Sequence, residues 1–324
     1  MKKTIWILLD DRIGSRHQAE GVAHYLKASD FEVVNKEVKY TIFAALPNII
    51  RGRTLMGIDG LSKKELVAPW PDFVLSASRR TAPVARWIKK QNPKTKLIQL
   101  LHIGRFGAKD FELIFAPEHD KGKYSPTNMI YTVGSPHFVT KEKLDEAKKT
   151  WSDEFSCLPH PITALIIGGA IKKRQFTLNN ATDLAQKVKN LKKKEGGSLL
   201  ITTSRRTGVE AEKVIMSYLG DIPQFSYLWG DKNPNPYLGF LACADNLIVT
   251  GDSVSMCCEA TATHKPLQIF TGEKWLTAKH LRFVNSLVEN GFASIFSGEP
   301  EAEKQGKSKE LNVAKDIAER ISQL

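Results

Sequence analysis

Short apolar runs alternate with amphipathic helical patterns along almost the whole chain, and this alternation limits the fold more than any other feature. Strand patterns are expected at 4–10, 31–38, 71–78, 95–103, 111–120, 129–136, 162–170, 196–204, 224–230, 246–251 and 265–272. Helical patterns between them are expected at 19–29, 81–91, 180–194 (with Asn180 as its cap), 208–219, 237–244 and 253–264. Strands that alternate with helices in this way favour parallel sheets wound with right-handed crossovers.

A change of pattern near the middle of the chain divides this series. The polar helical stretch 139–155 is followed by "CLPHP", which is typical of a linker, and the strand–helix series then begins again. A chain of 324 residues is also long enough for two domains. We therefore predict two Rossmann-like α/β domains at 1–155 and 156–305, with parallel sheets facing a central cleft. A last helix at 306–324 is expected to pack back on the first domain.

Composition and charge exclude several classes of protein. No apolar run reaches 18 residues, and the first apolar run ends in two aspartates, so we expect a first β-strand in a cytoplasmic protein. The four cysteines lack metal-ligand spacing. The net charge of +12 calls for an anionic partner, and no zinc-finger, RNP or helix-turn-helix pattern points to nucleic acid. The anionic partners that remain are a phosphorylated substrate and an anionic membrane face.

The tetrapeptide Ser-Arg-Arg-Thr occurs twice, at 78–81 and 204–207. Each copy follows an expected strand and precedes an expected helix. The carboxyl ends of parallel strands are where open α/β sheets bind ligands. The two copies are therefore expected to face one cleft for anionic groups, unless the tetrapeptide recurs by chance in so basic a chain.

The strongest local signal for a ligand is the segment 244–270. A buried strand ends in Thr250-Gly251-Asp252, and a helix then starts with Asp252 or Ser253 as its cap. Free N–H groups in the first turn of a helix bind phosphate. Glu259 lies one to two turns further on, where a carboxylate can accept two hydrogen bonds from a ribose diol. Ordinary caps and an ordinary helical glutamate are the plain alternative.

This segment resembles the nucleotide-binding half of GT-B glycosyltransferases, in "TGDSVSM", "EA" and "HKPLQIF". The whole chain resembles the bacterial relatives of the plant fission factor called elongated mitochondria, a family of inferred GT-B glycosyltransferases. The motifs that carry this resemblance run along nearly the full chain: "DRIGSRHQAEGVA", "SASRRTAPVARWIKK", "HIGRF", "LPHPITALIIGG", "TTSRRTG" and "NPYLGFLACADNLIVTGDSVSMCCEA".

The resemblance implies roles for the C-terminal half. Glu259 would hold the donor ribose, and Gly168 and Gly169 would let the donor approach closely. The departing diphosphate would be neutralised and cradled by Ser204, Arg205, Arg206, Asp252, Ser253, Val254, Ser255 and Met256. Positioned cations and a helix N-terminus stabilise the negative charge that grows on a leaving phosphate. No Asp-x-Asp occurs, which favours a mechanism without metal, and no cofactor besides a nucleotide-sugar substrate, most simply a UDP-sugar, is expected.

The loop 10–23 corresponds to the acceptor-facing loop of GT-B enzymes. Gly14 is expected to form a tight turn there. Asp10, Asp11 and His17 are the groups able to take a proton from an acceptor hydroxyl, with Asp11 or His17 preferred and no choice between them. A surface or capping histidine is the alternative for His17.

Other polar groups are expected on the acceptor side. Ser78, Arg79 and Arg80 can bind a phosphate or carboxylate of the acceptor, or form a salt bridge to the other domain. His102 and Arg105 follow another strand, and His102 is also compatible with a place in the core.

The segment 40–57 carries apolar residues at helical spacing beside Arg51, Arg53, Lys63 and Lys64. An apolar face with adjacent cations can lie on an anionic bilayer. A helix that covers the sheet of the first domain is the alternative. The first interpretation predicts peripheral contact with the cytoplasmic face of an inner membrane.

The function expected from these features is transfer of a sugar from a nucleotide-sugar to a cell-envelope glycan, such as lipopolysaccharide, or to a lipid-linked acceptor. Two alternatives stay open. A nucleotide-sugar epimerase or hydrolase has the same architecture, and a non-catalytic scaffold would keep the fold and recruit partners. Nucleotide release without an acceptor favours the first alternative, and absence of nucleotide affinity favours the second.

Overall fold

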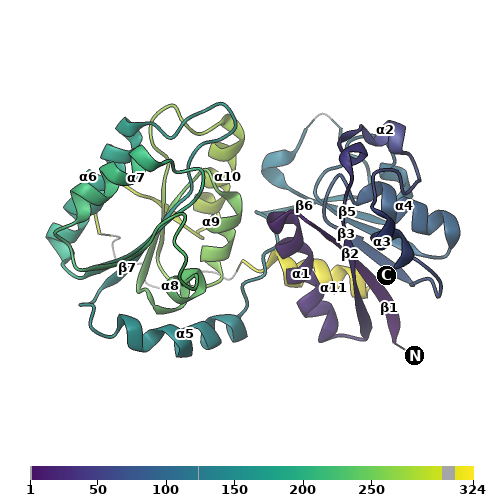
Figure 1. The fold of residues 1–324 in the computed structure, drawn as a ribbon, viewed down its shortest axis with the longest axis horizontal. Coiled ribbons are helices and arrows are strands. Elements are labelled where there is room, and N and C mark those ends of the chain that lie inside the picture. The colour runs from purple at the N-terminus through teal and green to yellow at the C-terminus, as the bar shows by residue number, and fades with distance from the viewer. Residues whose placement is uncertain (1, 123, 301–310) are drawn as a thin grey trace. The chain divides into compact units, whose positions relative to one another are not determined.

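The computed structural model describes residues 2–122, 124–300 and 311–324, which form two compact α/β units (Figure 1). Unit 1 comprises Met1–Phe138 and Asn312–Leu324, and unit 2 comprises Val139–Leu311. The described part of each unit contains a six-stranded sheet in which every neighbouring pair of strands is parallel.

The sheet of unit 1 has the strand order β2-β1-β3-β4-β5-β6. Its strands are β1 (Lys3–Asp10), β2 (Phe31–Val38), β3 (Phe73–Ser76), β4 (Lys96–Leu100), β5 (Leu113–Pro117) and β6 (Met129–Thr132). Its helices are α1 (Ile13–Lys27), η1 (Ile42–Ala45), α2 (Asn48–Arg51), α3 (Gly60–Lys64), α4 (Ala82–Gln91), η2 (Ala108–Asp110), η3 (Glu118–Asp120) and α11 (Val313–Ser322). The strand order reverses between β1 and β3, so loops leave the sheet on opposite sides there and open a crevice.

The sheet of unit 2 has the order β12-β11-β10-β7-β8-β9. Its strands are β7 (Ile162–Ile167), β8 (Ser198–Thr203), β9 (Gln224–Tyr227), β10 (Asn246–Thr250), β11 (Leu267–Phe270) and β12 (Ser294–Ile295). Its helices are α5 (Lys141–Phe155), α6 (Leu178–Glu195), α7 (Val209–Leu219), α8 (Tyr237–Cys243), α9 (Val254–Thr261) and α10 (Ala278–Glu289). Here the order reverses between β7 and β10.

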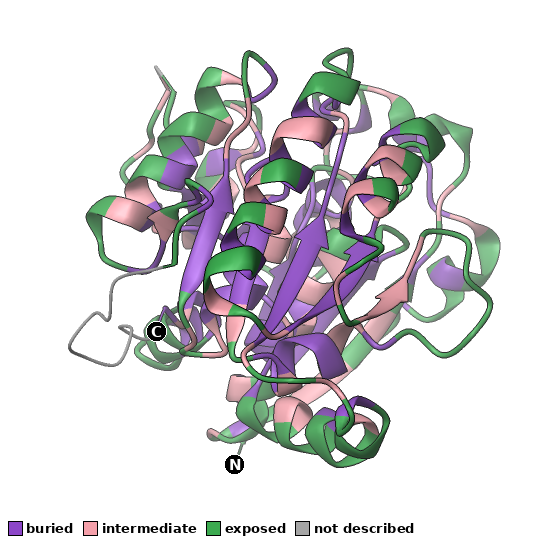
Figure 2. Ribbon diagram, turned by 90° about the vertical axis from the view of Figure 1, so that its left-hand side faces the viewer, coloured by how far each residue is buried: buried purple, intermediate pink, exposed green. Residues whose placement is uncertain are grey.

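The central strands are apolar on both faces because helices cover both. All residues of β3, β7 and β8 are buried. Figure 2 shows buried strands between helices whose outer faces are exposed. Continuous apolar runs of this kind are what parallel strands covered on both faces require.

The boundary between the units lies before α5, not after it, so the expected first domain of 1–155 is too long. Trp151 and Phe155 of α5 pack on α8 of unit 2, where the Phe155 and Phe240 rings lie 5.6 Å apart. Gly239 gives the Trp151 ring the room it needs, because a Cβ at Gly239 would meet that ring at 2.5 Å. The polar surface of α5 concealed this packing in the sequence.

The C-terminal helix α11 packs against α1 of unit 1, where Asn312 Nδ2 donates a hydrogen bond to Tyr25 Oη at 2.6 Å. Residues 301–310 lie outside the described residues. They comprise the end of the expected second domain, 301–305, and the first five residues of the expected segment 306–324. The helix itself is described from Val313 onward.

Two local predictions are wrong. Helix α1 begins at Ile13, so Gly14 lies in its first turn and forms no tight turn. The segment 40–57 is not one helix: it contains only the short η1 and α2, because Pro47 separates them and Gly52 ends the second. A smaller difference concerns α6, which Thr177 caps by accepting from Asn180 N–H.

Within the part of the chain that the structure describes, no helix combines the length and the apolar character needed to cross a bilayer.

Candidate functional site in unit 2

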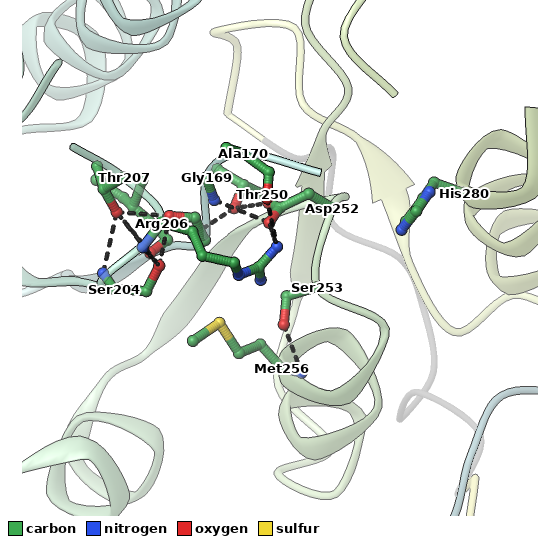
Figure 3. Close-up of polar contacts among 12 residues, drawn as sticks. Gly169, Ala170, Ser204, Arg206, Thr207, Thr250, Asp252, Ser253, Met256 and His280 are labelled. Carbon is green, nitrogen blue, oxygen red and sulfur yellow. Dashed lines mark hydrogen bonds and ion pairs between the residues drawn. The ribbon is translucent and has the colours of Figure 1, made fainter. Parts of the chain in front are cut away.

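The loops after β7, β8 and β10 meet at the point where the strand order of unit 2 reverses (Figure 3). Gly168 and Gly169 follow β7, the second Ser-Arg-Arg-Thr copy follows β8, and Asp252 and Ser253 follow β10. The structure therefore brings together most of the residues that the sequence analysis assigned to the donor. Arg205 is the exception, since it is exposed and takes no part in the network drawn in Figure 3.

Ser204 and Thr207 fold their own loop. The Ser204 N–H donates to Thr207 Oγ1 at 3.0 Å, and the Arg206 N–H donates to Ser204 Oγ at 3.2 Å. The Ser204 hydroxyl also donates to the Gly168 carbonyl at 2.7 Å, which joins the loop to the end of β7. The hydroxyl groups of Ser204 and Thr207 thus stabilise the backbone conformation of the loop, and the arginine side chains interact outside the loop.

Arg206 is paired with a carboxylate. Its Nη1 lies 2.9 Å from Asp252 Oδ2 and donates to the Ala170 carbonyl at 3.0 Å. No described residue is bonded to its Nε or Nη2, and the side chain is 38% exposed, so part of the guanidinium remains available to a ligand. In Figure 3 the guanidinium lies beside Asp252, on the side of Ser253.

Asp252 is buried and does not cap α9. It accepts hydrogen bonds from Gly169 N–H and from Thr250 Oγ1, each at 2.8 Å. Burial raises the pKa of this carboxyl, although the Arg206 charge opposes the rise. A buried carboxylate would repel phosphate, so Asp252 positions Arg206 and the Gly168-Gly169 turn instead of binding phosphate itself.

Ser253 caps α9, as one of the two expected alternatives. Its Oγ accepts from Met256 N–H at 3.5 Å, and the residues that follow, Val254, Ser255 and Met256, are half-buried. The first N–H groups of this eight-residue helix have no partners inside the helix and carry the positive end of its dipole.

The two glycines after β7 are required by the protein's own packing. A Cβ at Gly168 would lie 2.3 Å from Asp252 Oδ2, and one at Gly169 would lie 2.0 Å from the Arg206 backbone. Asp252 and the Arg206 backbone, and not a donor, thus make the close approach that was expected at Gly168 and Gly169.

Glu259 is 6% exposed and accepts a hydrogen bond from Tyr237 Oη at 2.5 Å. Burial raises the pKa of Glu259 to about 7, and the Tyr237 bond only partly offsets this. The carboxyl therefore changes its charge near neutral pH. Sequence reasoning gave Tyr237 and Thr250 no role, although both lie within the quoted motifs, because both act only through contacts that the fold creates.

The first Ser-Arg-Arg-Thr copy, in unit 1, has the same local structure. The Ser78 N–H donates to Thr81 Oγ1 at 3.1 Å, and the Arg80 N–H donates to Ser78 Oγ at 3.1 Å. Arg80 pairs with Asp10 and Asp11 at the end of β1, and the Ser78 hydroxyl donates to Asp10. In both copies the second arginine is therefore bound to a buried aspartate at a strand end.

Asp10 is fully buried. Burial alone would raise its pKa, but hydrogen bonds from Ser78, Arg12 N–H and Arg80 outweigh it, and the pKa is lowered. Asp10 is thus an ionised structural anchor at the β1–β3 reversal. Asp11 is paired with the same arginine.

The remaining residues assigned to the acceptor lie on separate elements of unit 1. The His17 ring, on α1, lies 3.9 Å from the Phe138 ring. His102 Nδ1 accepts from Gly104 N–H at 2.9 Å, and Arg105 covers the Tyr124 ring at 5.2 Å. His102 is half-exposed, so it is a loop residue and not a core residue.

The comparison with protein families decides where the chain belongs. Residues 13–324 match the family described as mitochondrial fission ELM1. The chain belongs to the mitochondrial fission ELM1 family. The mitochondrial fission protein ELM1 of Arabidopsis thaliana is 28% identical over an alignment 291 residues long, which covers 82% of this chain and 66% of that protein. The chain thus spans just under two thirds of this plant relative.

Solved structures show the same fold at low sequence identity. The UDP-GlcNAc 2-epimerase of Methanocaldococcus jannaschii is 12% identical with a TM-score of 0.60, and the match covers 99% of this chain and 98% of that one. A glycosyltransferase of Rickettsia africae is 11% identical with a TM-score of 0.50, over 99% and 88% of the two chains. These similarities and the two parallel sheets confirm the predicted GT-B-like α/β fold. That the two Ser-Arg-Arg-Thr loops line one cleft stays a prediction.

Proposed function

We propose that this ELM1-family protein binds a UDP-sugar in unit 2 and transfers the sugar, without a metal, to a cell-envelope glycan or lipid-linked acceptor. One observation carries the proposal: Arg206, the Gly168-Gly169 turn and the N-terminus of α9 meet at the strand-order reversal of unit 2 (Figure 3). Solved proteins with this fold are named for work on UDP-GlcNAc or for glycosyl transfer, which supports a uridine nucleotide as the first ligand to test.

The chemistry assigned to each group follows from its charge. The N–H groups of Val254 and Ser255 and the open side of Arg206, with exposed Arg205 nearby in sequence, would stabilise the diphosphate as it leaves. Glu259 would exchange its Tyr237 hydrogen bond for the ribose diol. Of the two expected bases, His17 is the better choice, because the Asp11 carboxylate is already paired with Arg80.

UDP affinity is expected to rise with pH through about 7, because only the ionised Glu259 accepts two hydrogen bonds from ribose hydroxyls. Glu259→Gln should lower UDP affinity about tenfold at pH 8 and remove most of the pH dependence, since a hydrogen bond to a charged group contributes about 1.5–3 kcal/mol. Titration calorimetry at pH 6 and pH 8 measures both effects.

Glu210→Gln is the matched control, because Glu210 is an exposed glutamate on α7 of the same unit. It should bind UDP like the wild type. Equal affinity of the wild type and Glu259→Gln at both pH values would remove Glu259 from the site, and no UDP binding at all would end the nucleotide proposal.

The reaction itself is tested by UDP release from UDP-GlcNAc. Transfer predicts release that depends on an added membrane-glycan or lipid extract, whereas release without an acceptor would indicate the epimerase or hydrolase alternative. The epimerase of the same fold makes that second outcome worth measuring.

We also propose that the segment 42–50 of unit 1 contacts an anionic membrane. Ile42 is 85% exposed and Ile49 is 65% exposed, with Phe43 and Ile50 also exposed beside them. Lys63 and Lys64 are exposed close by along the chain and supply positive charge for an anionic surface. Of the two arginines also expected there, Arg51 is buried and Arg53 is paired with Asp110.

The double variant Ile42→Ser/Ile49→Ser is expected to reduce partition onto vesicles of mixed phosphatidylglycerol and phosphatidylcholine at least tenfold, because each buried isoleucine contributes about 1.5–3 kcal/mol. Sedimentation with vesicles measures this, and salt near 0.5 M should weaken binding of the wild type. Leu178→Ser/Val209→Ser removes two exposed apolar residues from unit 2 and should bind like the wild type. Identical partition of all three proteins would contradict the proposal.

A further inference from the structure

The segment between β2 and α3 is fastened to the first Ser-Arg-Arg-Thr loop. It leaves and rejoins the sheet at one point, where Tyr40 pairs with Ile58 and Thr41 N–H donates to the Gly57 carbonyl at 3.0 Å. Its far end is held by two hydrogen bonds. Asn48 Nδ2 donates to the Arg79 carbonyl at 3.0 Å, and Arg79 Nη1 donates to the Leu46 carbonyl at 3.2 Å. The segment therefore lies over the β1–β3 reversal.

Arg51, at the end of α2 in this segment, is completely buried at 0% exposure. Its Nε donates to the Met56 carbonyl at 3.1 Å, but neither Nη1 nor Nη2 has a hydrogen-bond partner among the described residues. Nor does any acidic side chain of the described part form an ion pair with it. A buried charge that lacks a counter-charge is costly, so a group that supplies negative charge is expected here.

Tyr40, Arg79 and Arg80 interact electrostatically with the Arg51 guanidinium, and two of them carry further unpartnered donors. The Tyr40 hydroxyl and Arg80 Nε are also buried without a partner among the described residues, and Arg80 lies over the Tyr40 ring at 4.1 Å. Burial lowers the pKa of Arg51, and the charges of Arg79 and Arg80 lower it further. Burial also raises the pKa of Tyr40, so its phenol keeps its proton and remains a donor.

The neighbouring acids do not neutralise Arg51. Asp10 and Asp11 lie at the end of β1, and both are already paired with Arg80. Asn48 Oδ1 is the one unpartnered acceptor in this group of residues, and a hydroxyl on the ligand would satisfy it. Water could satisfy the donors, but it would leave the charge of Arg51 uncompensated.

We propose that Arg51 Nη1 and Nη2, Tyr40 Oη and Arg80 Nε form a binding site for an oxyanion, namely a phosphate monoester or a carboxylate. A planar guanidinium binds two oxygens of such a group at once. If the proposed transfer reaction holds, the oxyanion is the charged group of the acceptor, and this assignment to an acceptor is the only part that rests on the proposed function.

The site is tested with inorganic phosphate, by thermal shift and titration calorimetry in a phosphate-free buffer. The wild type should be stabilised by phosphate, since a ligand that binds only the folded state raises its melting temperature. Arg51→Met and Tyr40→Phe should lower phosphate affinity at least tenfold and about threefold, respectively. Lys39→Gln removes an exposed charge from the same segment and should respond like the wild type.

The melting temperature without phosphate separates a binding arginine from a structural one. Arg51→Met should keep or raise it, because replacing an uncompensated buried charge by an apolar side chain of similar length is neutral or stabilising. If Arg51→Met does not fold, Tyr40→Phe carries the test alone. A phosphate response that is absent in the wild type, or unchanged in both variants, overturns the proposal.

Vesicles of equal charge identify the source of the phosphate. A lipid source predicts that the protein prefers phosphatidic acid, a phosphate monoester, over phosphatidylglycerol, and that Arg51→Met loses this preference. A soluble source predicts the phosphate response with no such preference. Either result supports the site. A protein that binds UDP but not phosphate overturns this inference alone, and the reverse result overturns the UDP proposal alone.

Discussion

Gly169→Ala is expected to destabilise unit 2 by about 3–5 kcal/mol and to abolish nucleotide binding. A Cβ at Gly169 would lie 2.0 Å from the backbone carbon and oxygen of Arg206, and the glycine has a φ of +153°. Backbone atoms cannot move away as the end of a side chain can. A strained φ costs about 1–3 kcal/mol and overpacking about as much again. The hydrogen bond from Ala170 N–H to the Arg206 carbonyl, 2.8 Å in length, would be lost with the loop's position.

Urea unfolding followed by circular dichroism measures the loss, and UDP titration measures the function. Gly220→Ala is the control, because a Cβ there meets only the Met216 carbonyl at an ordinary 3.4 Å and the backbone is already helical. That variant should unfold within about 0.5 kcal/mol of the wild type. A Gly169→Ala protein as stable as Gly220→Ala would show that the two loops can separate at little cost.

The architecture could be predicted because it depends on local patterns. Apolar runs such as that of β7 become parallel strands, and amphipathic stretches become the helices that cover them. The order of the strands in each sheet could not be predicted from local patterns, yet this order determines where the sites lie. Only the order shows that β1 and β3 in unit 1, and β7 and β10 in unit 2, border the reversals.

The failures share a cause, since each concerns a residue whose role is set by distant partners. Gly14 suggested a turn, but no strain requires one, and α1 simply extends through it. Asp252 suggested a cap because aspartate is a common one, whereas Arg206 and Gly169, far along the chain, draw its carboxylate into the interior. Tyr237 was given no role, and Arg51 was wrongly expected on a surface that contacts a membrane, because the sequence shows neither the hydrogen bond from Tyr237 to Glu259 nor the burial of Arg51.

The repeated tetrapeptide is the most instructive case. Its matched context was recognised in the sequence, but the serine and both arginines of each copy were assigned to ligand binding. In the structure Ser and Thr fold the loop, and the second arginine pairs with a buried aspartate. Only the first arginine of each copy, Arg79 or Arg205, lies on the exposed side. The motif is therefore chiefly a way to fix a loop at a strand end, with one cation directed outward.

Because the two arginines of each copy have different roles, we expect their replacement to change the stability of the protein by very different amounts. Arg80→Met and Arg206→Met should destabilise their own units by about 3 kcal/mol, because each leaves a buried carboxylate, Asp10 or Asp252, without its cation. Arg205→Met removes an exposed arginine and should lie within about 0.5 kcal/mol of the wild type. Arg79→Met also loses the hydrogen bond to the Leu46 carbonyl and should cost at most about 1.5 kcal/mol. Hydrogen exchange read by mass spectrometry assigns each loss to one unit.

The pH dependence of the Arg80→Met loss tests its cause. In the wild type the pKa of Asp10 lies below its ordinary value of 3.8, so the stabilisation from this ion pair is present above pH 4 and is lost as pH falls through the lowered pKa. Without Arg80 the carboxyl protonates at higher pH, so the deficit of Arg80→Met should be largest near pH 7 and should shrink below about pH 4. If Arg80→Met loses the same stability at both pH values, Arg80 stabilises the loop through its contact with the Tyr40 ring. If Arg79→Met and Arg80→Met lose equal stability, the buried aspartates do not distinguish the two positions.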